Sequence, residues 1–312
     1  MMNFEWTGVF PAVTTKFGAD DQLDFDAFDK NIYAQLEAGV NGIILGGSLG
    51  EASVLTDDEK FALLKHTLEL VEGRVPVILN IAEQTTRSAV EIAKKAYEYG
   101  ANGLMLLPPM RYKADDDETV AFFTEVAKST PLEIMIYNNP VDYKIEVTLE
   151  MFEQLATIEN IVAVKESTRD VINVTRMINR FGDRFKIFTG VDPIATESLM
   201  MGADGWVAGL VDAFPRETVA IYRLIKAGRY EEARAIHRWF LPVLELDIHP
   251  KLVQYIKLAE VATGIGTERV RAPRLPLKGE ERTRVQKIIA DAVAARPELP
   301  VGSWGSVETL SN

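Results

Sequence analysis

The chain has 312 residues, and its 34 basic and 46 acidic side chains give a net charge of −12, which argues against binding to nucleic acid or anionic membranes. Apolar residues make up 47% and charged residues 26%, which excludes disordered and fibrous classes. There is no cysteine, so disulfides, thiolate metal sites and a cysteine nucleophile are excluded. Neither an apolar run of about 18 residues nor a signal-peptide pattern is present, so we expect a cytoplasmic protein that does not bind membranes.

Short apolar runs recur over the first two thirds of the chain, and each is too short to form a helix. They are rich in Val, Ile and Leu, which is typical of strands buried on both faces. In chain order these runs are 8–15, 42–47, 75–81, 103–107, 132–137, 161–165, 185–189 and 205–210.

Amphipathic stretches with helical spacing lie between these runs. The stretch that begins at Thr56 opens with a capping box, in which Thr56 and Glu59 satisfy each other's backbone N–H groups. Glycines such as Gly39 and Gly100 stand where helices are expected to end. The predicted helices are 25–38, 56–72, 85–99, 117–128, 148–155, 171–181, 193–201 and 215–227.

This strand–helix alternation predicts an α/β fold, a closed (β/α)8 TIM barrel, over residues 1–227. An open doubly wound sheet is the alternative. Residues 228–296 are expected to add a helical region packed on the barrel, with helices at 230–246, 250–263 and 280–295. Residues 297–312 are expected to form a weakly ordered tail.

Active sites of such barrels lie at the carboxyl ends of the strands. Lys165 ends an apolar strand, and burial there favours its neutral amine, which attacks carbonyl groups and forms Schiff bases. A salt-bridged or solvent-facing lysine is the alternative. Tyr137 ends the preceding strand and could move protons for Lys165, although this position taken alone favours a tyrosine that only packs.

The turn from Gly46 to Glu51 follows the second strand. Its glycines allow close approach of the backbone, and successive N–H groups can bind an anion. The spacing matches neither a P-loop nor a dinucleotide fingerprint. A carboxylate fits this turn better than a phosphate, and a tight turn without a ligand is the alternative.

An acidic run from Asp115 to Glu118 resembles a metal cluster. Consecutive carboxylates before a helix more often form a solvated helix N-terminus, and this is the interpretation we favour. The histidines are scattered, so no metal is expected.

Together these motifs resemble the dihydrodipicolinate synthase/N-acetylneuraminate lyase superfamily of class I, lysine Schiff-base barrels, over residues 8–295. The motifs that carry the resemblance are Gly8–Thr15, Gly47-Ser48-Leu49-Gly50-Glu51, Tyr137-Asn138-Asn139-Pro140, Lys165-Glu166-Ser167-Thr168 and Phe188-Thr189-Gly190.

The resemblance implies a role for each matching position. Lys165 corresponds to the imine-forming lysine and Tyr137 to the phenol that moves protons. Ser48, with the backbone amides of Ser48 and Leu49, corresponds to the cradle for the substrate's 1-carboxylate, and Gly190 and Val207 line the same pocket. The family needs neither metal nor organic cofactor, and its members are mostly homotetramers built from dimers.

Three positions depart from the family's pattern. Leu49 replaces a second hydroxyl residue of the turn. Met110-Arg111 replaces a tyrosine pair that completes a hydroxyl relay in the synthases, with Tyr112 one place later. Asp142 stands where the synthases carry an arginine that binds the second substrate's carboxylate, and Arg111 is a candidate to pair with Asp142 or to supply the missing charge.

We therefore expect a lyase that forms a Schiff base with a pyruvate-like or hydroxylated 2-oxo acid. Dehydration, deamination and retro-aldol cleavage all remain open, because one imine serves all three. The alternatives are a synthase-type condensation of pyruvate with an aldehyde, a barrel that binds small acids without turnover, and a phosphate-binding barrel enzyme.

Overall fold

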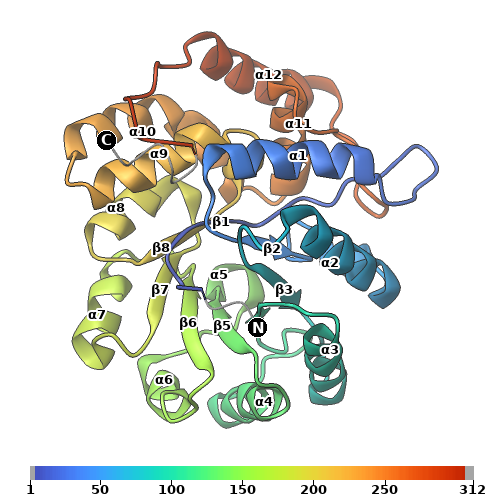
Figure 1. Cartoon of the computed structure of the whole chain (residues 1–312), viewed down its shortest axis with the longest axis vertical. Coiled ribbons are helices and arrows are strands. Elements are labelled where there is room, and N and C mark those ends of the chain that lie inside the picture. Colours follow the sequence, from blue (N-terminus) through green and yellow to red (C-terminus); the bar gives the residue numbers. More distant parts are fainter. Residues whose placement is uncertain (1–3, 306–312) are drawn as a thin grey trace.

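The computed structural model describes residues 4–305, and its centre is a parallel barrel (Figure 1). Strands are hydrogen-bonded in the order β1-β8-β7-β6-β5-β4-β3-β2. The ring closes between β1 and β2, where Ala12 pairs with Ile44 and the Val13 N–H donates to the Ile44 carbonyl at 3.0 Å. The strands are β1 (Gly8–Pro11), β2 (Ile43–Leu45), β3 (Val77–Ile81), β4 (Gly103–Leu106), β5 (Glu133–Asn138), β6 (Ile161–Glu166), β7 (Lys186–Thr189) and β8 (Gly205–Ala208).

Helices surround the barrel, and a further group lies beside α1 and α9 in the upper part of Figure 1. Together they confirm the predicted TIM barrel with additional C-terminal helices. The barrel helices are α1 (Phe25–Ala38), α2 (Asp57–Val71), α3 (Thr86–Glu98), α4 (Asp116–Lys128), α6 (Leu149–Leu155), α7 (Ile172–Phe181), α8 (Ala195–Met200) and α9 (Pro215–Lys226). The C-terminal helices are α10 (Tyr230–Leu244), α11 (Leu252–Thr263) and α12 (Gly279–Ala294).

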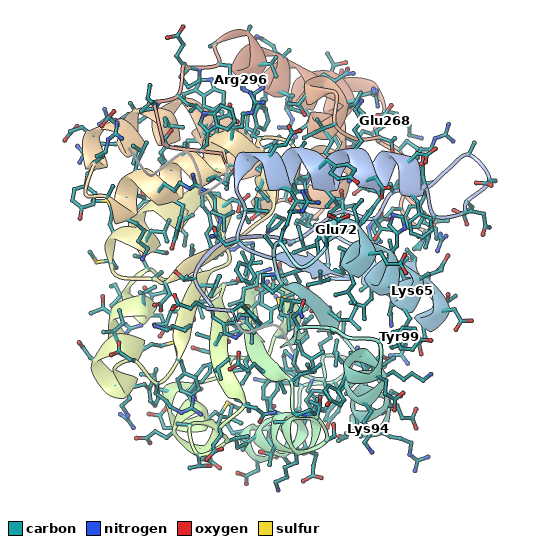
Figure 2. The ribbon with its side chains drawn as sticks, in the orientation of Figure 1. Lys65, Glu72, Lys94, Tyr99, Glu268 and Arg296 are labelled. Carbon is teal, nitrogen blue, oxygen red and sulfur yellow. The ribbon has the colours of Figure 1, made fainter. Side chains whose placement is uncertain are left out.

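Local sequence signals explain most element boundaries. The capping box predicted at the start of α2 is present, since Thr56 accepts from the Glu59 N–H and Glu59 accepts from the Thr56 N–H. Gly39 ends α1 with φ +86°, a left-handed conformation that glycine adopts without strain. The strands are almost wholly buried, while charged side chains such as Lys65, Glu72 and Lys94 point outward (Figure 2).

Short helical turns at the carboxyl ends of strands were not predicted. At the strand ends these are a one-turn helix α5 (Pro140–Tyr143) and the 3-10 helices η1 (Ala52–Val54), η2 (Asp192–Ile194) and η3 (Leu210–Asp212), and a further 3-10 helix, η4 (Glu245–Ile248), lies between α10 and α11. Each is too short to carry a helical periodicity in the sequence. Several of them form walls of the pocket described below.

The beginning of the expected tail packs against the barrel helices. The Gly305 N–H donates to the Ala38 carbonyl at 2.9 Å, and Arg223 donates to the Gly305 carbonyl at 2.7 Å. The Arg216 guanidinium lies 4.2 Å from the centre of the Trp304 ring. The expectation of a weakly ordered tail is therefore wrong at Trp304 and Gly305 and stays a prediction for residues 297–303, while residues 306–312 lie outside the described part of the chain.

None of the helices described within residues 4–305 combines the length and the apolar character needed to cross a bilayer.

Candidate active site

Lys165 lies one residue before the end of β6, with only 7% of its surface exposed. Its Nζ is 4.0 Å from the centre of the Tyr137 ring. Burial lowers the pKa of the Lys165 amine, because the charged form loses its hydration. A Cβ added at Gly190 would lie 2.6 Å from Lys165 Cγ, so the lysine stem occupies space that only glycine leaves open. Lys165 is thus held at the carboxyl end of the barrel, in surroundings that favour the neutral amine more than water does.

Tyr137 lies on β5 directly beside Lys165 in the strand register. Its hydroxyl accepts a hydrogen bond from Asn139 Nδ2 at 3.1 Å. Burial is the main cause that raises the pKa of the Tyr137 phenol. The phenol is therefore protonated at neutral pH and can donate a proton or a hydrogen bond beside the lysine.

A second tyrosine, Tyr143, lies beside Tyr137 and was missed by the sequence analysis. Tyr143 ends α5, and its hydroxyl is hydrogen-bonded to the Ser48 hydroxyl of the turn after β2. The two tyrosine rings meet edge to face, with centres 5.6 Å apart. Burial raises the pKa of Tyr143 as well. The Ser48 hydroxyl therefore lines the pocket while it is hydrogen-bonded to the Tyr143 phenol.

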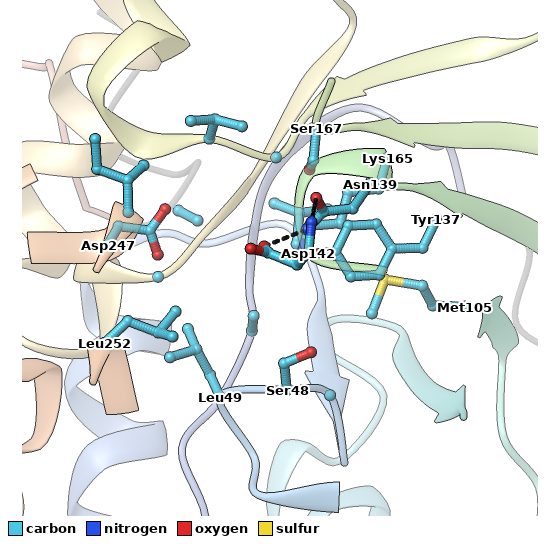
Figure 3. A pocket seen from close by; sticks show the side chains of 18 of the residues that line it. Ser48, Leu49, Met105, Tyr137, Asn139, Asp142, Lys165, Ser167, Asp247 and Leu252 are labelled. Carbon is cyan, nitrogen blue, oxygen red and sulfur yellow. Dashed lines mark hydrogen bonds between the residues drawn. The ribbon is translucent and has the colours of Figure 1, made fainter. Parts of the chain in front are cut away.

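One pocket brings most of the predicted site residues together (Figure 3). Strands β5 and β6 supply the reactive side chains, the turn after β2 supplies one wall, and the ends of β7 and β8 supply another. The predicted residues that line it are Ser48, Leu49, Tyr137, Asp142, Lys165, Gly190 and Val207.

Arg111 is the exception. Asp142 accepts from Asn139 Nδ2 at 2.8 Å, and Arg169 Nη2 lies 4.0 Å from its other oxygen. Arg111 instead lines a separate cavity on the other side of the Ser48–Tyr143 pair. The candidate pair of Arg111 with Asp142 is therefore wrong. The cation near Asp142 is Arg169, which lies in the loop after β6 and has φ +65°.

Tyr112, which follows the positions of the family's tyrosine pair, lies away from the pocket. Tyr112 is 56% exposed and lines neither this pocket nor the cavity that holds Arg111. The phenol next to Ser48 comes from Tyr143, in the loop after β5 and not in the loop after β4. The positions of the family's tyrosine pair do not point to Tyr143. Its place six residues after Tyr137, in the loop that follows the same strand, is the sequence feature that could have predicted it.

Two carboxyl groups face Lys165 from the other side of the pocket region. Asp192 is 1% exposed and accepts hydrogen bonds from Trp206 Nε1 at 2.9 Å, Gly209 N at 3.1 Å and Leu210 N at 2.6 Å. Asp247 lines the pocket and accepts from the Asp192 N–H at 3.2 Å. Burial, followed by the negative charge of Asp192, raises the pKa of Asp247 to about 8.

Neither carboxyl group was predicted. Asp192 follows Gly190 at a strand end, so strand-end reasoning could have identified it. Asp247 belongs to the helical region after the barrel, and no pattern in the sequence links that segment to the pocket. Figure 3 shows its side chain across the cavity from Tyr137 and Asp142.

The acidic run before α4 is a helix start, as predicted. Asp115 caps α4 by accepting from the Glu118 N–H at 2.8 Å, and Glu118 accepts from the Asp115 N–H at 3.0 Å. In the part of the chain that the structure describes, no group of three or more His, Asp or Glu side chains is placed to hold a metal ion.

Comparisons with known proteins find relatives along nearly the whole chain. The model of the dihydrodipicolinate synthetase family matches residues 5–292. A 4-hydroxy-tetrahydrodipicolinate synthase from Kosmotoga olearia is 31% identical over 93% of this chain and 99% of its own length. Another from Exiguobacterium sibiricum is 33% identical over 86% of this chain and 91% of its own length.

Solved structures of the same kind superimpose along nearly the whole chain. The 4-hydroxy-tetrahydrodipicolinate synthase from Methylacidiphilum fumariolicum has a TM-score of 0.89 at 26% identity, covering 93% of this chain and 97% of that chain. A dihydrodipicolinate synthase from Bacillus anthracis has a TM-score of 0.88 at 30% identity, covering 92% and 99%. The chain belongs to the dihydrodipicolinate synthetase family and is a class I, Schiff-base-forming lyase.

Proposed function

We propose that Lys165 forms the Schiff base, and that the substrate is a pyruvate-like or hydroxylated 2-oxo acid. The observation that carries this proposal is a contrast among buried lysines within residues 4–305. Lys16 and Lys257 are buried but ion-paired, with Glu260 at 2.8 Å and Glu51 at 2.5 Å. Lys165 is buried in the pocket, and no carboxylate of the described residues lies within 4.0 Å of its amine. A desolvated, unpaired amine is the one that reacts as a nucleophile at neutral pH.

The proposed reaction starts with attack of the neutral amine on the 2-oxo carbon. Loss of water gives a protonated imine, which withdraws electrons from C3, so that a proton or a bond there can break to leave an enamine. Tyr137 donates and accepts the protons of these steps. The turn at Ser48 and Leu49 binds the substrate's carboxylate through its backbone N–H groups, in the manner that the family resemblance implies.

Asp142 favours a hydroxylated substrate over the aldehyde of the synthase reaction. The synthases hold a second carboxylate with an arginine at this position, and here the position carries a negative charge. Arg169 brings a positive charge to the same wall. It lies 4.0 Å from Asp142, so the two opposite charges largely offset each other and neither dominates this wall. Paired donors and acceptors of this kind suit hydroxyl groups better than a carboxylate.

Synthase-type condensation of pyruvate with an aldehyde is the second candidate function, since the relatives described above carry the synthase name. A coupled assay separates the two. Purified protein is mixed with pyruvate and aspartate semialdehyde and coupled to dihydrodipicolinate reductase, and in parallel it is given a panel of hydroxylated 2-oxo acids. We expect turnover of a hydroxylated acid and no coupled signal. Synthase turnover comparable to that of a genuine synthase would contradict the substrate proposal.

Two further properties remain predictions: a cytoplasmic location and assembly as a homotetramer built from dimers. Light scattering on purified protein measures the assembly directly. A mass close to four times 34.7 kDa is expected, and a mass equal to one chain would contradict it.

A further inference from the structure

Asp247 is a carboxyl group that faces the pocket from outside the barrel. It lies in η4, between α10 and α11, and its side chain is partly exposed to the cavity. One oxygen accepts from the Asp192 N–H at 3.2 Å. The other lies over Gly209, where an added Cβ would come within 2.7 Å of it. The close-up in Figure 3 shows the carboxyl group separated from Tyr137 and Asp142 by open pocket.

Asp247 and Asp192 differ in how well their charge is satisfied. Asp192 receives N–H donors from the Trp206 side chain and from the backbone of Gly209 and Leu210, and these donors stabilise its ionised form. Asp247 receives a single backbone N–H. When two neighbouring carboxyl groups compete for one proton, the group with fewer donors keeps it. Asp247 is therefore the member of the pair that carries a proton into the pocket.

The proposed chemistry requires an acid that protonates the leaving group, and a protonated carboxyl group at the far end of the pocket can serve as this acid. Once the enamine has formed at Lys165, a hydroxyl or amino group on C4 can leave, but hydroxide and amide are poor leaving groups. Neither Tyr137 nor Lys165 is free for this task, because both already act at C2 and C3. A separate acid on the opposite wall would protonate the departing atom.

We propose that Asp247 is the general acid that protonates the leaving oxygen or nitrogen at C4 of the substrate, an inference that rests on the lyase function proposed above. The enamine nitrogen's electron pair forms the C2=N bond, the C2=C3 electrons form C3=C4, and the C4–heteroatom bond breaks with its pair on the heteroatom. The Asp247 O–H proton moves to that heteroatom, which leaves as water or ammonia, and Asp247 is left ionised. Hydrolysis of the conjugated imine then releases the product and regenerates the Lys165 amine.

The pH dependence follows from the groups around Asp247. Asp192 faces it from η2, Lys165 from β6, Arg169 from the loop after β6, and Tyr137 from β5. Burial and Asp192 raise the pKa of Asp247 to about 8, against the opposing charges of Lys165 and Arg169. Below this pH the carboxyl group is protonated and can act as an acid, and above it the proton is lost. Elimination is therefore expected to slow as the pH rises through about 8.

The test compares two reactions of the Asp247→Asn variant. Exchange of the C3 protons of pyruvate in D2O, followed by NMR, needs only the imine and the enamine. Elimination from a 2-oxo-3-deoxy sugar acid, which carries a hydroxyl at C4, also needs the leaving-group acid. We expect exchange within a few-fold of the wild type, which also shows that the variant is folded, and elimination slowed by about 10²–10⁴-fold. Glu245→Gln, an exposed change on the same 3-10 helix, is the matched control and should leave both rates unchanged.

Three outcomes would overturn the inference. They are unchanged elimination in Asp247→Asn, equal losses of exchange and elimination, and wild-type exchange without elimination from any 4-hydroxylated 2-oxo acid. If the wild-type protein does not exchange the C3 protons of pyruvate at all, the underlying lyase function fails as well, so the two failures are distinguishable. The pH profile of the wild type is an independent measurement, in which elimination but not exchange should fall above about 8.

Discussion

Ser48, Tyr143 and Tyr137 form a series of contacts that leads to Lys165. Tyr143 binds Ser48 through its hydroxyl, and its ring meets Tyr137, whose own ring covers the Lys165 amine at 4.0 Å. Burial raises the pKa of both phenols, so both are protonated and can donate hydrogen bonds at neutral pH. We propose from this arrangement that Tyr143 orients the Ser48 hydroxyl toward the carboxylate of the proposed substrate.

Tyr143→Phe tests that role. Removing only the phenol oxygen keeps the ring contact with Tyr137 but leaves the Ser48 hydroxyl without its partner, which costs about 1–3 kcal/mol. We expect kcat/KM for the 2-oxo acid to fall by about 10- to 100-fold in steady-state assays. Tyr112→Phe, in an exposed tyrosine, is the control and should have no effect. Equal activity of the two variants would show that Tyr143 only fills space.

At this scale the sequence predicts residues on strands better than residues in loops. Lys165 and Tyr137 follow from their places at the ends of apolar runs, because the barrel dictates where strand ends point. Tyr143 and Asp247 lie in short turns whose conformations depend on the residues packed against them. No local sequence pattern therefore predicts that these two side chains reach the pocket. Arg111 was misassigned for the same reason, since the path of its loop decides which cavity the side chain lines.

Helix α11 is joined to the top of the barrel by buried ion pairs. Lys16, after β1, contacts Glu260 of α11 at 2.8 Å, and Lys257 of α11 contacts Glu51 of the turn after β2 at 2.5 Å. All four side chains are inaccessible to solvent. These contacts fix the C-terminal helices, and with them η4 and Asp247, relative to the strand ends.

Lys16→Met is expected to destabilise the protein by about 3–5 kcal/mol, because it leaves the Glu260 carboxylate buried without its cation. Asp212, whose pKa burial and Glu260 already raise, would add to the cost. Urea unfolding followed by circular dichroism measures the free-energy change. Lys30→Met, at an exposed position of α1, is the control and should change stability by no more than about 0.5 kcal/mol. A loss below about 1 kcal/mol for Lys16→Met would contradict the structural role of the pair.

The sequence predicts which segments are strands and which are helices, because the patterns that distinguish them lie within each segment. Apolar runs identified the strands, and caps such as Thr56 and Asp115 identified where helices begin. The ion pairs of α11 join residues more than two hundred positions apart, and their side chains look like ordinary surface charges in the sequence. The one-turn helices at the strand ends were missed because they contain too few residues to show a period.

For the molecule as a whole, the proposed chemistry uses amine, phenol and carboxyl groups of the described residues 4–305. The barrel and its C-terminal helices follow from the alternation of the sequence. The expectation of a weakly ordered tail was wrong at Trp304 and Gly305, because these two residues have partners on α1 and α9 that the tail's composition does not reveal. The acidic run at Asp115 is used as a helix cap.

Chelators are therefore expected to leave activity unchanged. Incubation with EDTA followed by assay on a 2-oxo acid measures this, with added Mg²⁺ or Zn²⁺ as the control for recovery. A loss of activity that either metal restores would show that carboxylates such as those of Asp115 and Glu118 hold an ion, in place of capping α4.

The central claim is that Lys165 is the nucleophile, and borohydride reduction in the presence of pyruvate tests it most directly. Reduction converts the imine into a stable secondary amine, which peptide mass spectrometry locates. We predict one adduct per chain, on Lys165, and neither adduct nor turnover in a folded Lys165→Ala variant, because loss of a covalent nucleophile costs many orders of magnitude in rate. An adduct on another lysine, or near-normal turnover by Lys165→Ala, would contradict the account.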